Sequence, residues 1–169
     1  IAEAVLYAAQ QGADVINLSL GTSDQSELME EVITGAIEAY DVFVVAAAGN
    51  RGFNKSAEAE GGALGDYRYI SITDPGNADG VITVGSTHRM MPHNYGVSYF
   101  SSRGPTGDGR LKPDLVAPGE RIRAPIREDW GDLDGTSMAA PHVSGAAAML
   151  MARYAELSGQ PRRIKQILC

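Results

Sequence analysis

Residues 135–145 read GTSMAAPHVSG, and they join a glycine-containing turn to a strongly apolar helix that we expect over residues 138–157. A serine at such a junction, Ser137, lies among the unpaired N–H groups at the positive end of a helix. Those groups can stabilise a negative charge that develops on a neighbouring oxygen. On spacing alone two interpretations stay open: a catalytic nucleophile or, more commonly, a helix-capping serine.

The segments upstream of this stretch alternate between helix and strand patterns. Residues 1–11 and 26–39 carry apolar positions at helical spacing, and residues 14–20 (DVINLSL), 42–48 (VFVVAAA) and 81–85 (VITVG) are typical of strands. The continuous apolar run at 42–48 indicates a strand covered on both faces. Alternation with short connections predicts a layered α/β fold with a parallel sheet.

Irregular structure is expected elsewhere. Residues 51–80 are glycine-rich without a sustained period and predict a long loop, and residues 97–120 contain several glycine and proline turns. Asp24 or Ser26 is expected to cap the second helix, and a further helix begins after Pro161.

Composition bounds the function. The chain has 169 residues, of which 44% are hydrophobic, with a formal net charge of −7 and 20 glycines. An acidic chain is a poor partner for nucleic acid, because phosphate binding needs clustered Lys and Arg. No apolar run is long enough to span a membrane. The single cysteine, Cys169, excludes an internal disulfide framework.

Residues 135–145 resemble the nucleophile motif of the subtilisin-like serine proteases, G-T-S-M-A-x-P-H-V-[AS]-G. Three more segments resemble that family in the same order: its substrate-cleft strand (VINLSLG, 15–21), its oxyanion segment (AAAGN, 46–50) and its region before the nucleophile (FSSRGP, 100–105, with KPDLVAPG, 112–119). The resemblance implies a three-layer, mostly parallel doubly wound sheet. It also implies that residues 1–169 are the C-terminal part of a peptidase domain whose N-terminal portion is missing.

The resemblance assigns two catalytic residues. Ser137 is expected to attack the scissile carbonyl, and Asn50 to donate its side-chain amide to the oxyanion together with the Ser137 N–H. Without the resemblance, Gly49-Asn50 after a strand is most often a turn.

The resemblance also assigns a substrate cleft. One strand presents its backbone to an extended peptide, a second strand lines the other wall of the primary specificity pocket, and Thr73 precedes a proline that is often cis in the family. On composition alone both strands are simply core, and Asp74-Pro75-Gly76 is a turn in any case. The expected substrate-binding residues are Ser19, Leu20, Gly21, Ala47, Ala48, Gly49 and Thr73.

The general base is absent from this pattern. In the family an Asp in D-[ST]-G and a His in H-G-T-H precede the cleft strand, and neither motif occurs in this chain. His142 lies about 140° round the helix from Ser137. His88 and His93 are expected in a surface loop. We therefore expect the triad Asp and His before Ile1, and an inactive fragment.

The sequence lacks the residue spacing of three other functional motifs. There is no G-x-S-x-G elbow and no P-loop. Asp132-Leu133-Asp134-Gly135 resembles part of a calcium loop, but Trp130 and Pro141 occupy its first and last ligand positions, which excludes an EF-hand. No cofactor and no metal ligands are expected in this chain. The resemblance implies structural calcium in the parent protein and a secreted or cell-envelope location.

Two functions follow. The first is a serine endopeptidase that hydrolyses peptide bonds through an acyl-enzyme on Ser137. The alternative is a non-catalytic subtilase-like binding or scaffold module. Expected partners are a polypeptide substrate, the missing N-terminal part, and a second copy in a dimer or swapped oligomer. Arg51 either lies at the specificity-pocket rim, favouring acidic substrate side chains, or is a solvated loop residue.

Overall fold

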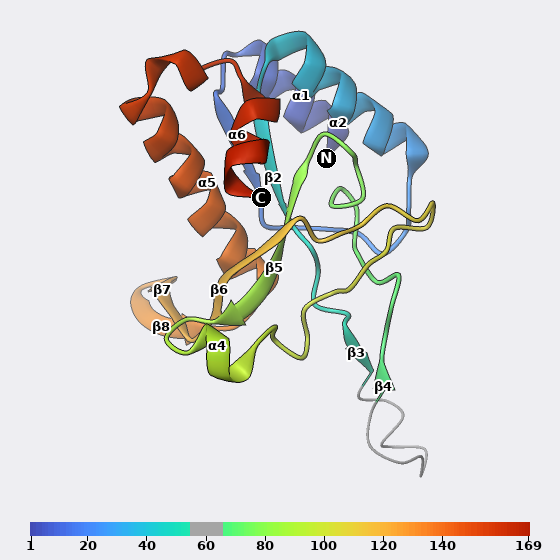
Figure 1. Cartoon of the computed structure of the whole chain (residues 1–169), viewed down its shortest axis with the longest axis vertical. Coiled ribbons are helices and arrows are strands. Elements are labelled where there is room, and N and C mark those ends of the chain that lie inside the picture. Colours follow the sequence, from blue (N-terminus) through green and yellow to red (C-terminus); the bar gives the residue numbers. More distant parts are fainter. Residues whose placement is uncertain (55–65) are drawn as a thin grey trace.

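The computed structural model describes residues 1–54 and 66–169, and its centre is a four-stranded parallel sheet (Figure 1). The strand order is β1-β2-β5-β6, and every adjacent pair is parallel. The strands are β1 (Val15–Leu18), β2 (Phe43–Ala47), β5 (Ile82–His88) and β6 (Leu115–Glu120).

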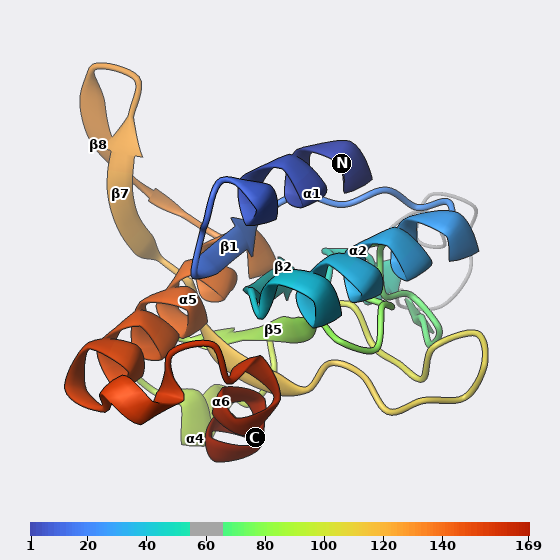
Figure 2. The same ribbon diagram turned by 90° about the horizontal axis from the view of Figure 1, so that it is seen from above.

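Helices cover both faces of this sheet, which gives three layers (Figure 2). One layer contains α1 (Ala2–Gln10) and α2 (Glu27–Tyr40), and the opposite layer contains α5 (Thr136–Arg153) and α6 (Pro161–Leu168). Ser26 is the N-cap of α2, and its side chain accepts a hydrogen bond from the Met29 N–H at 3.3 Å. The predicted three-layer parallel α/β fold is confirmed.

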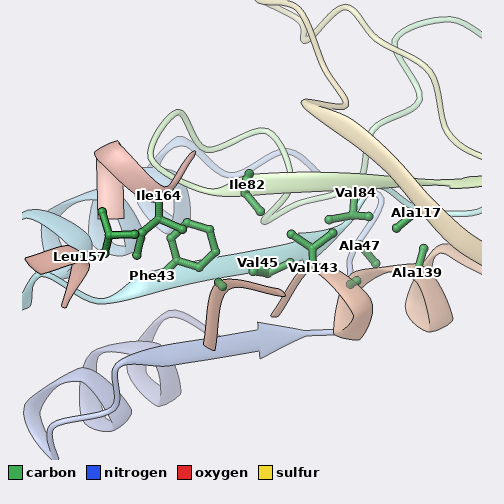
Figure 3. Close-up of a cluster of buried hydrophobic side chains, with 12 residues drawn as sticks. Phe43, Val45, Ala47, Ile82, Val84, Ala117, Ala139, Val143, Leu157 and Ile164 are labelled. Carbon is green, nitrogen blue, oxygen red and sulfur yellow. The ribbon is translucent and has the colours of Figure 1, made fainter. Parts of the chain in front are cut away.

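Strand β2 divides its side chains between two cores. Phe43, Val45 and Ala47 pack towards α5 and α6 (Figure 3), whereas Val44 and Ala46 belong to the cluster under α1 and α2. Alternate residues of a strand point to opposite faces, so a strand buried on both faces must be apolar at every position. This explains the unbroken apolar run at 42–48.

The end of the chain differs from the sequence expectation in two respects. The apolar helix was expected over 138–157, but α5 ends at Arg153, and a separate 3₁₀ turn covers Ala155–Leu157. The intervening Tyr154 has extended dihedrals (φ −129°, ψ 91°), which interrupt the helix. Apolar periodicity continues across this break, so the sequence pattern does not reveal it.

Strands also appear that the sequence pattern did not predict. The region 97–120 contains β6, and residues beyond it form the hairpin of β7 (Ile122–Ile126) and β8 (Asp129–Leu133), which projects from the body (Figure 2). Pro118 and Gly119 lower the strand propensity of β6, but an edge strand tolerates proline because one side needs no partner. His88 ends β5 rather than lying in the following loop.

The expected loop 51–80 is only partly described, since residues 55–65 lie outside the described ranges. Next to that gap, β3 (Phe53–Asn54) pairs with β4 (Asp66–Tyr67). A single helical turn, α4 (Pro92–Tyr95), follows β5 and carries His93.

A buried lysine anchors the loop that leads into β6. The Lys112 ammonium donates to the Val81 carbonyl at 2.8 Å and to an Asp114 carboxylate oxygen at 2.7 Å. Burial lowers the pKa of Lys112 to about 8. The Lys112 carbonyl in turn accepts from the Gly104 N–H at 3.0 Å, and the Gly104 carbonyl from the Ile70 N–H at 3.3 Å. The lysine thus supports a chain of contacts that reaches Ile70.

Candidate active site

Ser137 lies in the first turn of α5, at the edge of the sheet where the parallel strands end. The N-cap of α5 is Gly135, which makes no side-chain cap, and Ser137 is the second helical residue. Its hydroxyl donates to the Ser19 carbonyl at 3.1 Å instead of accepting from a helix N–H. The helix-cap interpretation of Ser137 is therefore wrong, because the backbone enters the helix two residues earlier.

Ser19 and Ser137 are joined by a second hydrogen bond. The Ser19 hydroxyl donates to the Ser137 carbonyl at 2.7 Å. That carbonyl would normally accept from the N–H four residues later, but this position is Pro141, which has no N–H. Pro141 is the sixth helical residue, past the first turn where a missing N–H costs nothing. Ser19 supplies the replacement donor, and this fixes the end of β1 against Ser137.

The side chain of Asn50 is oriented by Thr136. The Asn50 Oδ1 atom accepts from the Thr136 N–H at 2.9 Å and from the Thr136 hydroxyl at 3.1 Å, and that hydroxyl accepts from the Gly49 N–H at 3.1 Å. Because the Oδ1 atom is held by two hydrogen bonds from Thr136, the Nδ2 donor on the other side of the amide points away from Thr136. Sequence analysis did not assign Thr136 a role; its position beside Ser137 in the motif was the available signal.

Two hydrogen-bond donors beside the Ser137 hydroxyl have no acceptor in the described structure. Among the described residues, neither the Asn50 Nδ2 group nor the Ser137 N–H has a hydrogen-bond acceptor. The Ser137 N–H is unpaired because the first N–H groups of a helix have no partner within it. Asn50 is exposed and Ser137 is half-buried, so a ligand can reach both. The arrangement can therefore stabilise an oxyanion that forms beside the Ser137 hydroxyl.

Thr73 lies between the two glycines of the expected cleft. A Cβ placed on Gly21 would come within 2.5 Å of the Thr73 hydroxyl oxygen, and one on Gly49 within 2.7 Å. Neither glycine can carry a side chain without displacing Thr73, whose N–H also donates to the Ala48 carbonyl at 3.0 Å. The structure thus brings Gly21, Gly49 and Thr73 together, next to the cis Asp74–Pro75 bond.

The remaining expected cleft residues have different surroundings. Leu20 is 47% exposed, beside the end of β1. Ala47 and Ala48 are buried, and Ala47 packs in the core under α5, so their methyl groups face the interior. Gly49 is half-buried.

None of the three histidines contacts Ser137 in the described part of the chain. The His142 ring is exposed and hydrogen-bonds the Met138 carbonyl of its own helix at 2.9 Å, as expected for a side chain that faces away. The His88 ring accepts from the Met90 and Met91 N–H groups, each at 3.2 Å. The candidate nucleophile and the candidate oxyanion donors therefore lie together, and no described histidine contacts them.

The described residues contain neither a cluster of metal-binding side chains nor a membrane-spanning helix. Within residues 1–54 and 66–169, no group of three or more His, Cys, Asp or Glu side chains could hold a metal ion. Calcium in the parent protein stays a prediction. None of the described helices is both long and apolar enough to cross a membrane.

Comparison with known proteins identifies relatives. The chain is 34% identical over 202 residues to Pyrolysin of Pyrococcus furiosus, covering 99% of this chain and 13% of pyrolysin. It is 36% identical over 161 residues to the Major intracellular serine protease of Bacillus subtilis, covering 95% of this chain and 43% of that protein. Subtilisin DY of Bacillus licheniformis is 34% identical over 164 residues, with 96% and 52% covered.

Solved structures of proteases also resemble this chain. A psychrophilic protease matches with a TM-score of 0.78 at 29% identity, and a cold-adapted subtilisin-like serine proteinase with a TM-score of 0.71 at 28% identity. The match covers 99% of this chain and 53% of the first structure, and 98% and 51% for the second. The chain thus spans about half the length, or less, of the relatives it matches. A family model described as the subtilase family matches residues 1–169 from end to end, so the chain belongs to the subtilase family.

Proposed function

We propose that the protein containing this chain is a serine endopeptidase. The observation that carries the proposal is a pair of donors beside the Ser137 hydroxyl, the Asn50 Nδ2 group and the Ser137 N–H, neither of which has an acceptor among the described residues. A domain that only bound peptides would have no need for donors aimed at a developing negative charge. The alternative, a binding or scaffold module, is favoured only by the lack of a histidine next to Ser137.

The reaction follows from the geometry. The Ser137 hydroxyl oxygen attacks the scissile carbonyl while a general base takes its proton, and the two donors hold the resulting oxyanion. The C–N bond then breaks, the amine leaves with the proton returned by the base, and an acyl-enzyme remains on Ser137. Water then attacks the ester carbonyl while the base takes its proton, and the Ser137 oxygen leaves with that proton, which releases the acid and restores the hydroxyl. The Ser19–Gly21 backbone would align an extended peptide as an added strand.

The base is proposed to come from outside the chain. We infer that a histidine and its orienting aspartate lie in a segment preceding Ile1. Attack requires the Ser137 hydroxyl to turn its proton from the Ser19 carbonyl to that histidine. Family relatives include a protein named as intracellular, so the secreted or cell-envelope location also remains a proposal.

A fluorophosphonate probe tests this assignment, because such probes bond covalently to activated serines. We expect labelling at Ser137 in the intact protein. No labelling is expected in the isolated 169-residue chain, because no histidine contacts Ser137 within the described residues. Ser158→Ala removes an exposed serine distant in sequence from the motif and is the matched control. Labelling of the isolated chain at the rate of the intact protein would contradict a base outside the chain.

The isolated chain is also expected to self-associate. Strand β1 pairs only with β2 in the described residues, so its other edge is open to a further strand. Met149 on α5 is 69% exposed, although the same helix packs on the sheet. Light scattering on the isolated chain should detect dimers or larger species, whereas a monomer with a cooperative melt would contradict the expectation.

A further inference from the structure

A pocket of about 200 Å³ opens beside Thr73. Its lining runs back along the chain from Thr73 to Arg68 and also includes Ser23 and Arg51. Arg51 directly follows Asn50, and Ser23 follows the segment in which the Thr22 N–H donates to the Asp74 carbonyl at 2.9 Å. The pocket is therefore built mainly from residues 68–73, with one residue each from the segments that follow β1 and β2.

Thr73 connects this pocket to the proposed cleft. The same threonine lies against Gly21 and Gly49, where no side chain fits. A peptide lying along Ser19–Gly21, with its carbonyl at the oxyanion donors, would place the side chain of its acyl residue towards Thr73. Liquid water occupies about 30 Å³ per molecule, so the volume accommodates a side chain the size of glutamate.

The pocket is strongly cationic for so acidic a chain. Its lining contains two arginines, Arg51 and Arg68, and no acidic residue. Within the described residues neither guanidinium forms an ion pair, although Arg110, Arg123 and Arg162 all do. Unpaired guanidinium groups present fixed donors that match a carboxylate, which they can bind in a bidentate manner.

The wall that carries Arg68 is held in one conformation. Ile70 has φ 51°, which a β-branched residue rarely adopts and which persists only where the surroundings enforce it. Hydrogen bonds on both sides do so: the Arg68 N–H donates to the Gly52 carbonyl at 2.9 Å, and the Ser71 N–H to the Arg103 carbonyl at 2.9 Å. A rigid wall reduces the entropy lost when a ligand binds.

We propose that this pocket receives an acidic side chain of the substrate, so that the protease cleaves after glutamate or aspartate. Arg51 and Arg68 are the residues that determine this specificity. The inference rests on the proposed endopeptidase function and adds its substrate class. It also favours the pocket-rim interpretation of Arg51, because Arg51 lines the same pocket as Thr73.

Cleavage of matched peptides by the intact protein tests the inference. Two peptides differ only in Glu or Gln before the scissile bond, and kcat/KM is measured for each near neutral pH. We expect the Glu peptide to be cleaved at least about tenfold faster, the size of a charge-assisted hydrogen bond. Because both arginines are exposed, the preference should weaken as salt rises from about 0.05 M to about 1 M.

Charge-removing variants identify the residues. Arg51→Gln and Arg68→Gln should each reduce the Glu-to-Gln ratio, and the double variant should bring it close to one while the Gln peptide is cleaved normally. Arg163→Gln removes the same charge from an exposed position on α6 and should leave the ratio unchanged.

The possible failures are distinguishable. If the fluorophosphonate probe labels Ser137 and the Glu peptide is cleaved no faster than the Gln peptide, the specificity inference is overturned and the endopeptidase proposal stands. A Glu preference that survives in the double variant also overturns the role of the arginines. Absence of both labelling and cleavage overturns the proposed function, and this inference with it.

Discussion

Ser137→Ala should nearly abolish peptide hydrolysis by the intact protein. Removing the nucleophilic serine of a subtilisin lowers kcat by about 10⁶-fold, and that relative sets the expected scale. The physical reason is that no acyl-enzyme can form, and the two oxyanion donors then act only on direct attack by water. Hydrolysis of a chromogenic peptide measures the loss in kcat.

The substitution is expected to leave the fold intact. It removes one hydrogen bond to the Ser19 carbonyl but keeps the bond from the Ser19 hydroxyl to the carbonyl of residue 137. Ser158→Ala, at an exposed position after α5, should retain full activity. If the Ser137 variant kept a substantial fraction of wild-type kcat, with an unchanged melting curve, Ser137 would not be the nucleophile.

Asn50→Ala should lower kcat by about 100–1000-fold with little change in KM. The magnitude is that of removing one oxyanion donor and again comes from a subtilisin. The amide meets a full negative charge only in the transition state, so its loss affects the chemical step more than substrate binding. Steady-state kinetics with a peptide substrate separates the two parameters.

A second variant separates the effect of the Asn50 donor itself from the effect of the Thr136 hydroxyl that orients it. Thr136→Val removes the hydroxyl that contacts Asn50 and Gly49 but keeps the N–H that holds the Asn50 oxygen. We expect a smaller fall in kcat than for Asn50→Ala, because the donor is loosened and still present. Asn94→Ala, on the exposed α4, is the neutral control. A rise in KM at constant kcat for Asn50→Ala would assign the amide to substrate binding instead.

Much of the fold was predictable because its signals are local. The apolar run at 42–48, the Ser26 cap and the helix that begins at Pro161 all depend on residues close together in sequence. The edge strand β6 and the β7–β8 hairpin were missed. Their sequences contain proline, glycine and charged residues, and pairing with neighbouring strands outweighs these weak propensities.

The sequence by itself determined the family and pointed to the candidate reactive groups, since the motif around Ser137 and the segment ending in Asn50 are each a continuous stretch of sequence. Only the tertiary structure decided how they meet. Ser19 is 118 residues from Ser137, and Asn50 is 86 residues from Thr136. Their hydrogen bonds depend on the order and register of parallel strands, which local propensity does not specify. The same holds for Arg68, which lines a pocket with Arg51 because the segment before Thr73 folds back against the cleft.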